Sequence, residues 1–134
     1  TVVRNPWQRI HSWWWNNREI TGAVSLPFSK FIHTSLESSS PLPKSLRPQV
    51  NWITSGNGKV EMDYICRFES IDNDFREVCR LIRAPLVELP QVLVENRNPA
   101  SRRHYTEDYD AELRKLVAAV YAEDIELFNY RFNR

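Results

Sequence analysis

The chain has 134 residues, of which 42% are hydrophobic and 26% charged, and its formal net charge is +1. These values fit one globular domain with a moderate core, and they give no sign of a broad surface for nucleic acid or for lipid headgroups. No apolar run approaches the ~20 residues of a membrane-spanning helix, so we expect no membrane segment. Cys66 and Cys79 lack the spacing of a metal site; we expect no bound metal and two reduced, half-buried thiols.

The chain opens with the pattern of a strand that leads into a helix. Thr1–Val3 is a short β-branched run, typical of a buried strand. Asn5 is a good helix N-cap and Pro6 suits the first helical position, which predicts a helix from about Pro6 to about Arg18. Because the chain begins inside this strand, we expect that Thr1 is not the natural start of the protein.

This junction has the features of a phosphate-binding site. Arg4 lies just before the predicted helix, and Ser12 follows two turns along it. Free backbone N–H groups and the positive end of the helix dipole would face the same region, and arginine presents a planar fork that suits phosphate. The alternative is an ordinary junction with an exposed arginine and a half-buried serine.

Three consecutive tryptophans, Trp13–Trp15, point about 100° apart on that helix and cannot share one face. At least one of them is therefore expected to be exposed or to contact another segment. Packing beneath a neighbouring helix or a missing part of the chain is one interpretation. The other is a stacking wall for a ring-shaped ligand such as a sugar or an adenine.

A second helix is predicted from Ser25, its cap, to about Glu37, with Pro27 in the first turn. Its apolar residues recur at helical spacing at Phe28, Phe31, Ile32 and Leu36. The stretch 38–48 is a loop by its serine and proline content. It is either a mobile lid near the substrate or a solvated connection.

Two strands are predicted at Val50–Ile53 and Val60–Ile65, with Gly56 and Gly58 in the turn between them. A helix capped by Ser70 is expected to follow, from about Ile71 to Arg83. Its buried face is predicted to carry Ile71, Phe75, Val78 and Ile82.

The last helix is predicted to start near Thr106, a capping residue followed by acidic side chains, and to end near Phe128. Its apolar stripe consists of Leu113, Leu116, Val117, Val120 and Tyr121. Asn129 is expected to take the left-handed cap position, since asparagine tolerates that geometry.

Three segments, in this order and at this spacing, resemble the sulfotransferase family, specifically its carbohydrate-type branch with many bacterial members. The first is Arg4-Asn5-Pro6 with Arg9 and Ser12 downstream. The second is the strand, Arg-Phe-Glu turn and capped helix over residues 64–75. The third joins residues 105–109 to residues 120–132, where Phe-Asn-Tyr replaces the family's usual Phe-Gly-Tyr. The resemblance covers nearly the whole chain.

The resemblance implies a transferase of the α/β class. The family moves a sulfuryl group from 3′-phosphoadenosine 5′-phosphosulfate (PAPS) to a hydroxyl, usually on a sugar. We therefore expect one P-loop NTPase-like sulfotransferase domain over residues 1–134, incomplete, mostly helical here and with a few short strands. PAPS is the expected co-substrate, and a hydroxyl-bearing acceptor, a carbohydrate by the same resemblance, is the expected partner.

The resemblance also assigns candidate site residues. Arg4 and Ser12 match the family's two ligands for the donor 3′-phosphate. Arg9 matches a basic position of the same motif. Arg67 lies at the turn before a helix, where it would line the nucleotide site or instead pair with Glu69 or Asp74.

Two parts of the family's site have no counterpart in this sequence. The family cradles the 5′-phosphosulfate with a glycine-rich loop and a lysine upstream of the Arg4 motif, and this chain has only three glycines and no such loop. The usual general base also commonly precedes that motif, so the catalytic residues are unknown. His11, His33 and His104 are the candidates within the chain, and none has an orienting partner visible in the sequence.

Three hypotheses follow. The first is the C-terminal part of a PAPS-dependent sulfotransferase, which carries the 3′-phosphate-binding half and is inactive by itself if the missing loop is required. The second is a non-catalytic nucleotide- or glycan-binding module derived from that fold. The third is an unrelated helical interaction domain. We expect a cytoplasmic, bacterial-type protein, with the Golgi lumen as the alternative for an animal source.

Overall fold

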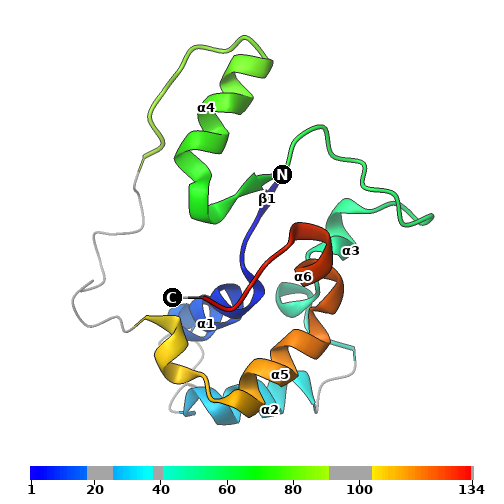
Figure 1. Ribbon diagram of the computed structural model, residues 1–134, viewed down its shortest axis with the longest axis vertical. Coiled ribbons are helices and arrows are strands. Elements are labelled where there is room, and N and C mark those ends of the chain that lie inside the picture. Colours follow the sequence, from blue (N-terminus) through cyan, green and yellow to red (C-terminus); the bar gives the residue numbers. More distant parts are fainter. Residues whose placement is uncertain (18–25, 38–40, 91–103, 134) are drawn as a thin grey trace. The chain divides into compact units, whose positions relative to one another are not determined.

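The computed structural model describes residues 1–17, 26–37, 41–90 and 104–133 (Figure 1). The chain divides into two compact units: Thr1–Arg4 with Met62–Arg103, and Asn5–Glu61 with His104–Arg134. The described residues are mostly helical, with one small parallel sheet of two strands, which agrees with the expected mixture of helices and short strands. A complete P-loop-type sandwich stays a prediction. Within the described ranges no helix is long and apolar enough to cross a membrane.

The first unit is built on a parallel strand pair. The strand predicted at the start of the chain is confirmed as β1 (Val2–Val3), which pairs with β2 (Cys66–Arg67) so that Val3 lies opposite Arg67. The N-terminal ammonium of Thr1 donates to the Tyr64 carbonyl at 3.0 Å and extends this contact. Two segments that are far apart in the sequence therefore end at the same edge of one sheet.

Helix α4 (Ile71–Leu81) follows β2 through the 3₁₀ turn Phe68–Ser70. It begins where the sequence predicted and ends earlier, because the chain turns at Arg83, whose φ is 57°, and the Ala84 N–H donates to the Cys79 carbonyl at 2.9 Å. This closure is typical of helix C-termini. Cys79 is the buried residue of the helix, whereas Ile82 is 68% exposed, so the predicted apolar face is only partly buried.

The second unit is a helical assembly around a common core. Its helices are α1 (Pro6–Asn17), α2 (Phe28–Leu36), α3 (Val50–Ile53), α5 (Ala111–Val120) and α6 (Ala122–Phe128). Helices α1, α2 and α5 pack against one another, and α6 contacts α3 and α5 (Figure 1). The core includes Ile10, Ile32, Leu113, Val117 and Tyr121. The predicted helix end at Arg18 and cap at Ser25 lie outside the described residues.

The tryptophan run packs mainly against α2. Trp13 stacks on Phe31 with ring centroids 5.3 Å apart, and Trp14 lies 5.2 Å from Phe28. The indole Nε1 of Trp14 also donates to the Leu26 carbonyl at 3.2 Å. Trp13 and Trp14 therefore form a helix–helix contact, as the first of the two interpretations predicted, whereas Trp15 lies against His11 and Trp14 of α1 itself.

Residues 41–48, the described part of the predicted loop, contain the 3₁₀ turn Lys44–Leu46. Leu46 is buried, and its carbonyl accepts a 2.6 Å hydrogen bond from the Tyr121 hydroxyl. This part of the loop is thus fastened to the core of its unit. Residues 38–40 lie outside the described ranges.

We expect Tyr121→Phe to lower the free energy of unfolding by about 1 kcal/mol at pH 8, because the Leu46 carbonyl loses its buried donor. Burial raises the pKa of Tyr121 to about 12. The neutral phenol therefore stabilises the fold fully below about pH 10, and this contribution is lost as the pH rises toward about 12. Urea unfolding should show that the free energies of unfolding of variant and wild type differ less at pH 11 than at pH 8. An equal difference at the two pH values would contradict this role.

The strand predicted at Val50–Ile53 is wrong, because these residues form the one-turn helix α3. The backbone N–H groups of Gln49 and Val50 each donate to the Asp124 carboxylate on α6, at 2.8 Å. A carboxylate from a distant segment therefore satisfies the helix N-terminus and overrides the β-branched composition.

The second strand of that predicted hairpin is also wrong over most of its length. Val60 forms an isolated antiparallel bridge with Thr54, and residues 61–65 are irregular. The predicted turn is confirmed, with Gly58 at a φ of 76° and its N–H donating to the Ser55 carbonyl at 2.9 Å.

The last helix differs from its prediction at its start and in its middle. Thr106 lies in a 3₁₀ turn, and the helix begins at Ala111 with Asp110 as its cap, since the Asp110 carboxylate accepts from the Leu113 N–H at 2.8 Å. The chain breaks at Tyr121 into α5 and α6. The left-handed cap at Asn129 is confirmed by its φ of 52°.

Candidate functional site

Two arginines lie at the carboxyl edge of the parallel strand pair in the first unit. Arg4 directly follows β1, and Arg67 is the last residue of β2, opposite Val3. In open α/β sheets, ligands bind outside the carboxyl ends of the strands. Arg67 is exposed and Arg4 is half-buried, and a guanidinium group is well suited to an anionic ligand.

An aromatic ring from the second motif orients Arg4. The Arg4 guanidinium carbon lies 4.1 Å from the centroid of the Phe68 ring, in the turn that follows β2. This cation–π contact restrains a flexible side chain. Within the first unit, the structure therefore brings Arg4 and the Arg-Phe-Glu turn together, which no short-range pattern in the sequence indicates.

The turn itself is held by Asp74. One carboxylate oxygen of Asp74 accepts from the backbone N–H of Arg67 at 2.6 Å and from the hydroxyl of Ser70 at 3.0 Å. The carboxylate also lies near the N-terminus of α4, where the helix dipole favours a negative charge. Arg67 therefore contacts Asp74 through its backbone N–H.

The N-terminus of α1 is capped by its own asparagine. The side-chain oxygen of Asn5 accepts from the N–H groups of Trp7, at 3.1 Å, and Gln8, at 3.5 Å. The side-chain amide of Asn5 donates to the Arg131 carbonyl at 2.8 Å. The predicted cap is confirmed, and the expectation that these N–H groups are free for an anion is wrong. The positive end of the helix dipole remains.

Ser12 and Arg9 lie on α1 in the second unit. Ser12 is 6% exposed, and its hydroxyl oxygen accepts from the Asn16 amide at 3.4 Å. The Arg9 guanidinium donates to the carbonyls of Arg47 and Ser45, both at 2.9 Å. Arg9 therefore fastens the 3₁₀ turn of the loop, a role that the sequence analysis missed. Contact of Arg9 with the donor phosphate stays a prediction. The same holds for the expectation that Ser12 and Arg4 bind one phosphate group.

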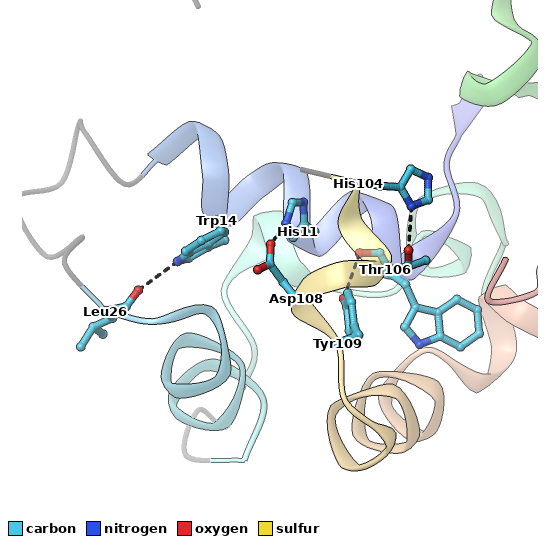
Figure 2. Close-up of polar contacts among 8 residues, drawn as sticks. His11, Trp14, Leu26, His104, Thr106, Asp108 and Tyr109 are labelled. Carbon is cyan, nitrogen blue, oxygen red and sulfur yellow. Dashed lines mark hydrogen bonds and ion pairs between the residues drawn. The ribbon is translucent and has the colours of Figure 1, made fainter. Parts of the chain in front are cut away.

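His11 is a buried residue of the second unit (Figure 2). Its side chain is 1% exposed, and its Nε2 lies 2.8 Å from a carboxylate oxygen of Asp108. The ring packs among aromatic side chains, with Phe28 at 5.2 Å and Trp14 at 5.6 Å between centroids. This environment joins α1 to the segment before α5 and gives His11 a structural role.

The other two histidines have short-range partners. His33 Nδ1 lies 2.9 Å from a Glu37 carboxylate oxygen, one turn away on the exposed surface. His104 Nδ1 lies 2.8 Å from the Thr106 hydroxyl (Figure 2). The structure thus gives each histidine a partner that the sequence analysis did not identify, and the general base stays unknown.

Over the ranges that the structure describes, no group of three or more His, Cys, Asp or Glu side chains gathers as a metal site would require. Cys66 and Cys79 are free thiols. They are 7% and 4% exposed, so both are buried and not half-buried as predicted.

The chain matches the family model described as "Sulfotransferase family" over residues 1–131. No curated protein and no solved structure gives a significant match. The matched region contains both arginines at the strand edge, the α1 motif and the C-terminal helices. The chain belongs to the sulfotransferase family.

Proposed function

We propose that this chain binds the 3′-phosphate of PAPS in a sulfotransferase that transfers the sulfuryl group to a hydroxyl of a carbohydrate. The observation that carries the proposal is the register of the parallel pair, with Val3 opposite Arg67. It sets Arg4 and Arg67 at the carboxyl edge of one sheet, the common ligand-binding edge of α/β proteins. Family membership supports the class of reaction.

The residues at this edge fit a phosphate monoester. Arg4 offers a planar fork for two parallel hydrogen bonds, and Phe68 beneath it restrains the guanidinium before a ligand arrives. Restraint of this kind lowers the entropy lost on binding. Arg67 adds a second cation at this edge. We propose Ser12 as a further ligand of the phosphate on the family motif alone.

PAPS supplies an activated sulfuryl group when it is bound. The part that we assign to this chain is positioning: Arg4 and Ser12 hold the far end of the donor and so fix its register for in-line attack by the acceptor hydroxyl. Transfer then also needs a cation at the leaving phosphate oxygen and a base for the hydroxyl proton. We assign neither group to a residue of this chain.

The test is a calorimetric titration with adenosine 3′,5′-bisphosphate and with adenosine 5′-monophosphate as the control ligand. We expect the chain to bind the bisphosphate more tightly than the monophosphate. Arg4→Ala should lower the affinity for the bisphosphate by about tenfold or more, because a charged hydrogen-bond partner contributes about 1.5–3 kcal/mol. Affinity for the monophosphate should be unchanged.

Arg76→Ala is the matched control, since Arg76 is an exposed arginine of the same unit, on α4. It should leave the preference for the bisphosphate intact. Equal affinity for the two nucleotides in the wild type, or an equal loss in both arginine variants, would overturn the 3′-phosphate assignment.

A further inference from the structure

One carboxylate oxygen fixes both ends of the turn that carries Phe68. Asp74 lies in the first turn of α4, and this oxygen accepts from the Arg67 N–H before the turn and from the Ser70 hydroxyl at its end. Ser70 makes no side-chain capping bond to α4, so its hydroxyl serves the turn. Asp74 therefore ties the two ends of the turn together.

The position of the Phe68 ring depends on the backbone of this turn. The side chain is 46% exposed, so packing in the core holds only part of it. The ring lies 4.1 Å from the guanidinium carbon of Arg4, whose long side chain would otherwise sample many rotamers. The contacts thus run from Asp74 through the turn to Phe68 and on to Arg4, and all of these residues belong to the first unit.

The negative charge of Asp74 means that two possible roles predict opposite effects. A carboxylate close to an anion site repels the ligand, so its removal should strengthen binding if charge alone counts. Its removal should weaken binding if its hydrogen bonds hold the turn in place. The sign of the change in affinity therefore distinguishes the two roles.

We propose that Asp74 is a positioning residue for the donor phosphate: it holds the turn so that the Phe68 ring covers one face of the Arg4 guanidinium. This inference rests on the proposed function of Arg4 and deepens it. A guanidinium donates hydrogen bonds in its own plane, so a ring over one face leaves the donor edge open to the ligand. Ordering Arg4 before the ligand arrives lowers the entropy lost on binding.

The test is a titration of adenosine 3′,5′-bisphosphate into the variants Asp74→Ala and Asp74→Asn. Both substitutions remove the charge, but asparagine keeps a side-chain oxygen that can accept both hydrogen bonds. We expect Asp74→Ala to lower the affinity about two- to tenfold, which corresponds to the cost of immobilising one long side chain. Asp74→Asn should bind at least as tightly as the wild type. Equal affinities of the two variants would overturn the proposal.

A double-mutant cycle tests whether Asp74 acts through Phe68. Phe68→Leu should weaken binding by a similar factor, and Asp74→Ala should add little to that loss; additive losses would overturn the proposal. Ser70→Ala removes one of the two hydrogen bonds and should give a smaller loss, which keeps the test decisive if Asp74→Ala fails to fold. Asp72→Asn is the matched control, because Asp72 is an exposed aspartate in the same turn of α4, and it should not weaken binding.

A measurement without ligand separates this inference from the proposed function. The Phe68 ring should shift the side-chain proton resonances of Arg4 upfield in the NMR spectrum of the wild type. We expect Asp74→Ala to lose this shift and Asp74→Asn to keep it, and an unchanged shift in Asp74→Ala would overturn the positioning role. If the shifts behave as expected but the wild type does not bind the bisphosphate, the donor assignment is overturned, and with it the role of Asp74 in binding.

Discussion

Asp124→Ala is expected to lower the free energy of unfolding by about 3–5 kcal/mol, because three buried donors lose their acceptor at once. The Asp124 side chain is fully buried. Its carboxylate accepts from the N–H of Gln49 and the N–H of Val50, each at 2.8 Å, and from the Gln49 side-chain amide at 3.2 Å. The loss should unfold α3 and loosen its contact with α6.

Urea unfolding followed by tryptophan fluorescence gives the measurement, and two further variants separate the causes. Asp124→Asn keeps the shape and one acceptor, so we expect about half of the alanine effect. Glu126→Ala changes an exposed residue of the same helix and should change stability by less than about 0.5 kcal/mol. An alanine effect as small as that of the control would contradict the role of Asp124 in capping α3.

His11→Ala is expected to destabilise the protein by about 2–4 kcal/mol, through a cavity in the aromatic cluster and the loss of a hydrogen bond. The ring lies among Trp14, Trp15 and Phe28, and its Nε2 faces Asp108 at 2.8 Å. Asp108 keeps access to water, since its side chain is 24% exposed. Most of the cost should therefore come from packing.

A double-mutant cycle with Asp108→Ala separates the hydrogen bond from the packing. We expect a coupling energy of about 1 kcal/mol, smaller than the total effect of His11→Ala. His33→Ala is the matched control, because that ring is exposed and pairs with Glu37 on the surface; its effect should stay within about 0.5 kcal/mol. Equal effects of the two histidine variants would refute a structural role for His11.

The sequence predicted best those elements whose stability is local. The α1 helix follows from Asn5 and Pro6, whose cap and ring geometry act within a few residues. The left-handed turn at Asn129 was also predicted, because a single residue carries that conformation.

The failures occur where a distant partner decides the local structure. Val50–Ile53 has the composition of a strand, but Asp124 supplies the acceptors that make it a helix. The predicted helix start at Thr106 is wrong for a local reason, because Asp110 carries the capping carboxylate. That signal was present, since an aspartate three residues before Leu113 precedes the apolar stripe.

For the candidate site, the sequence by itself determined which residue types are present: an arginine before a capped helix, an Arg-Phe-Glu turn, and a serine two turns along α1. Only the tertiary structure decided that Arg4 lies on Phe68 at the edge that it shares with Arg67, because that contact requires two strands to pair in parallel. The same holds for Arg131, which lines one groove together with Arg114 and Lys115 of α5. Short-range propensities act within a few residues, whereas strand pairing and helix packing join residues that no local pattern connects.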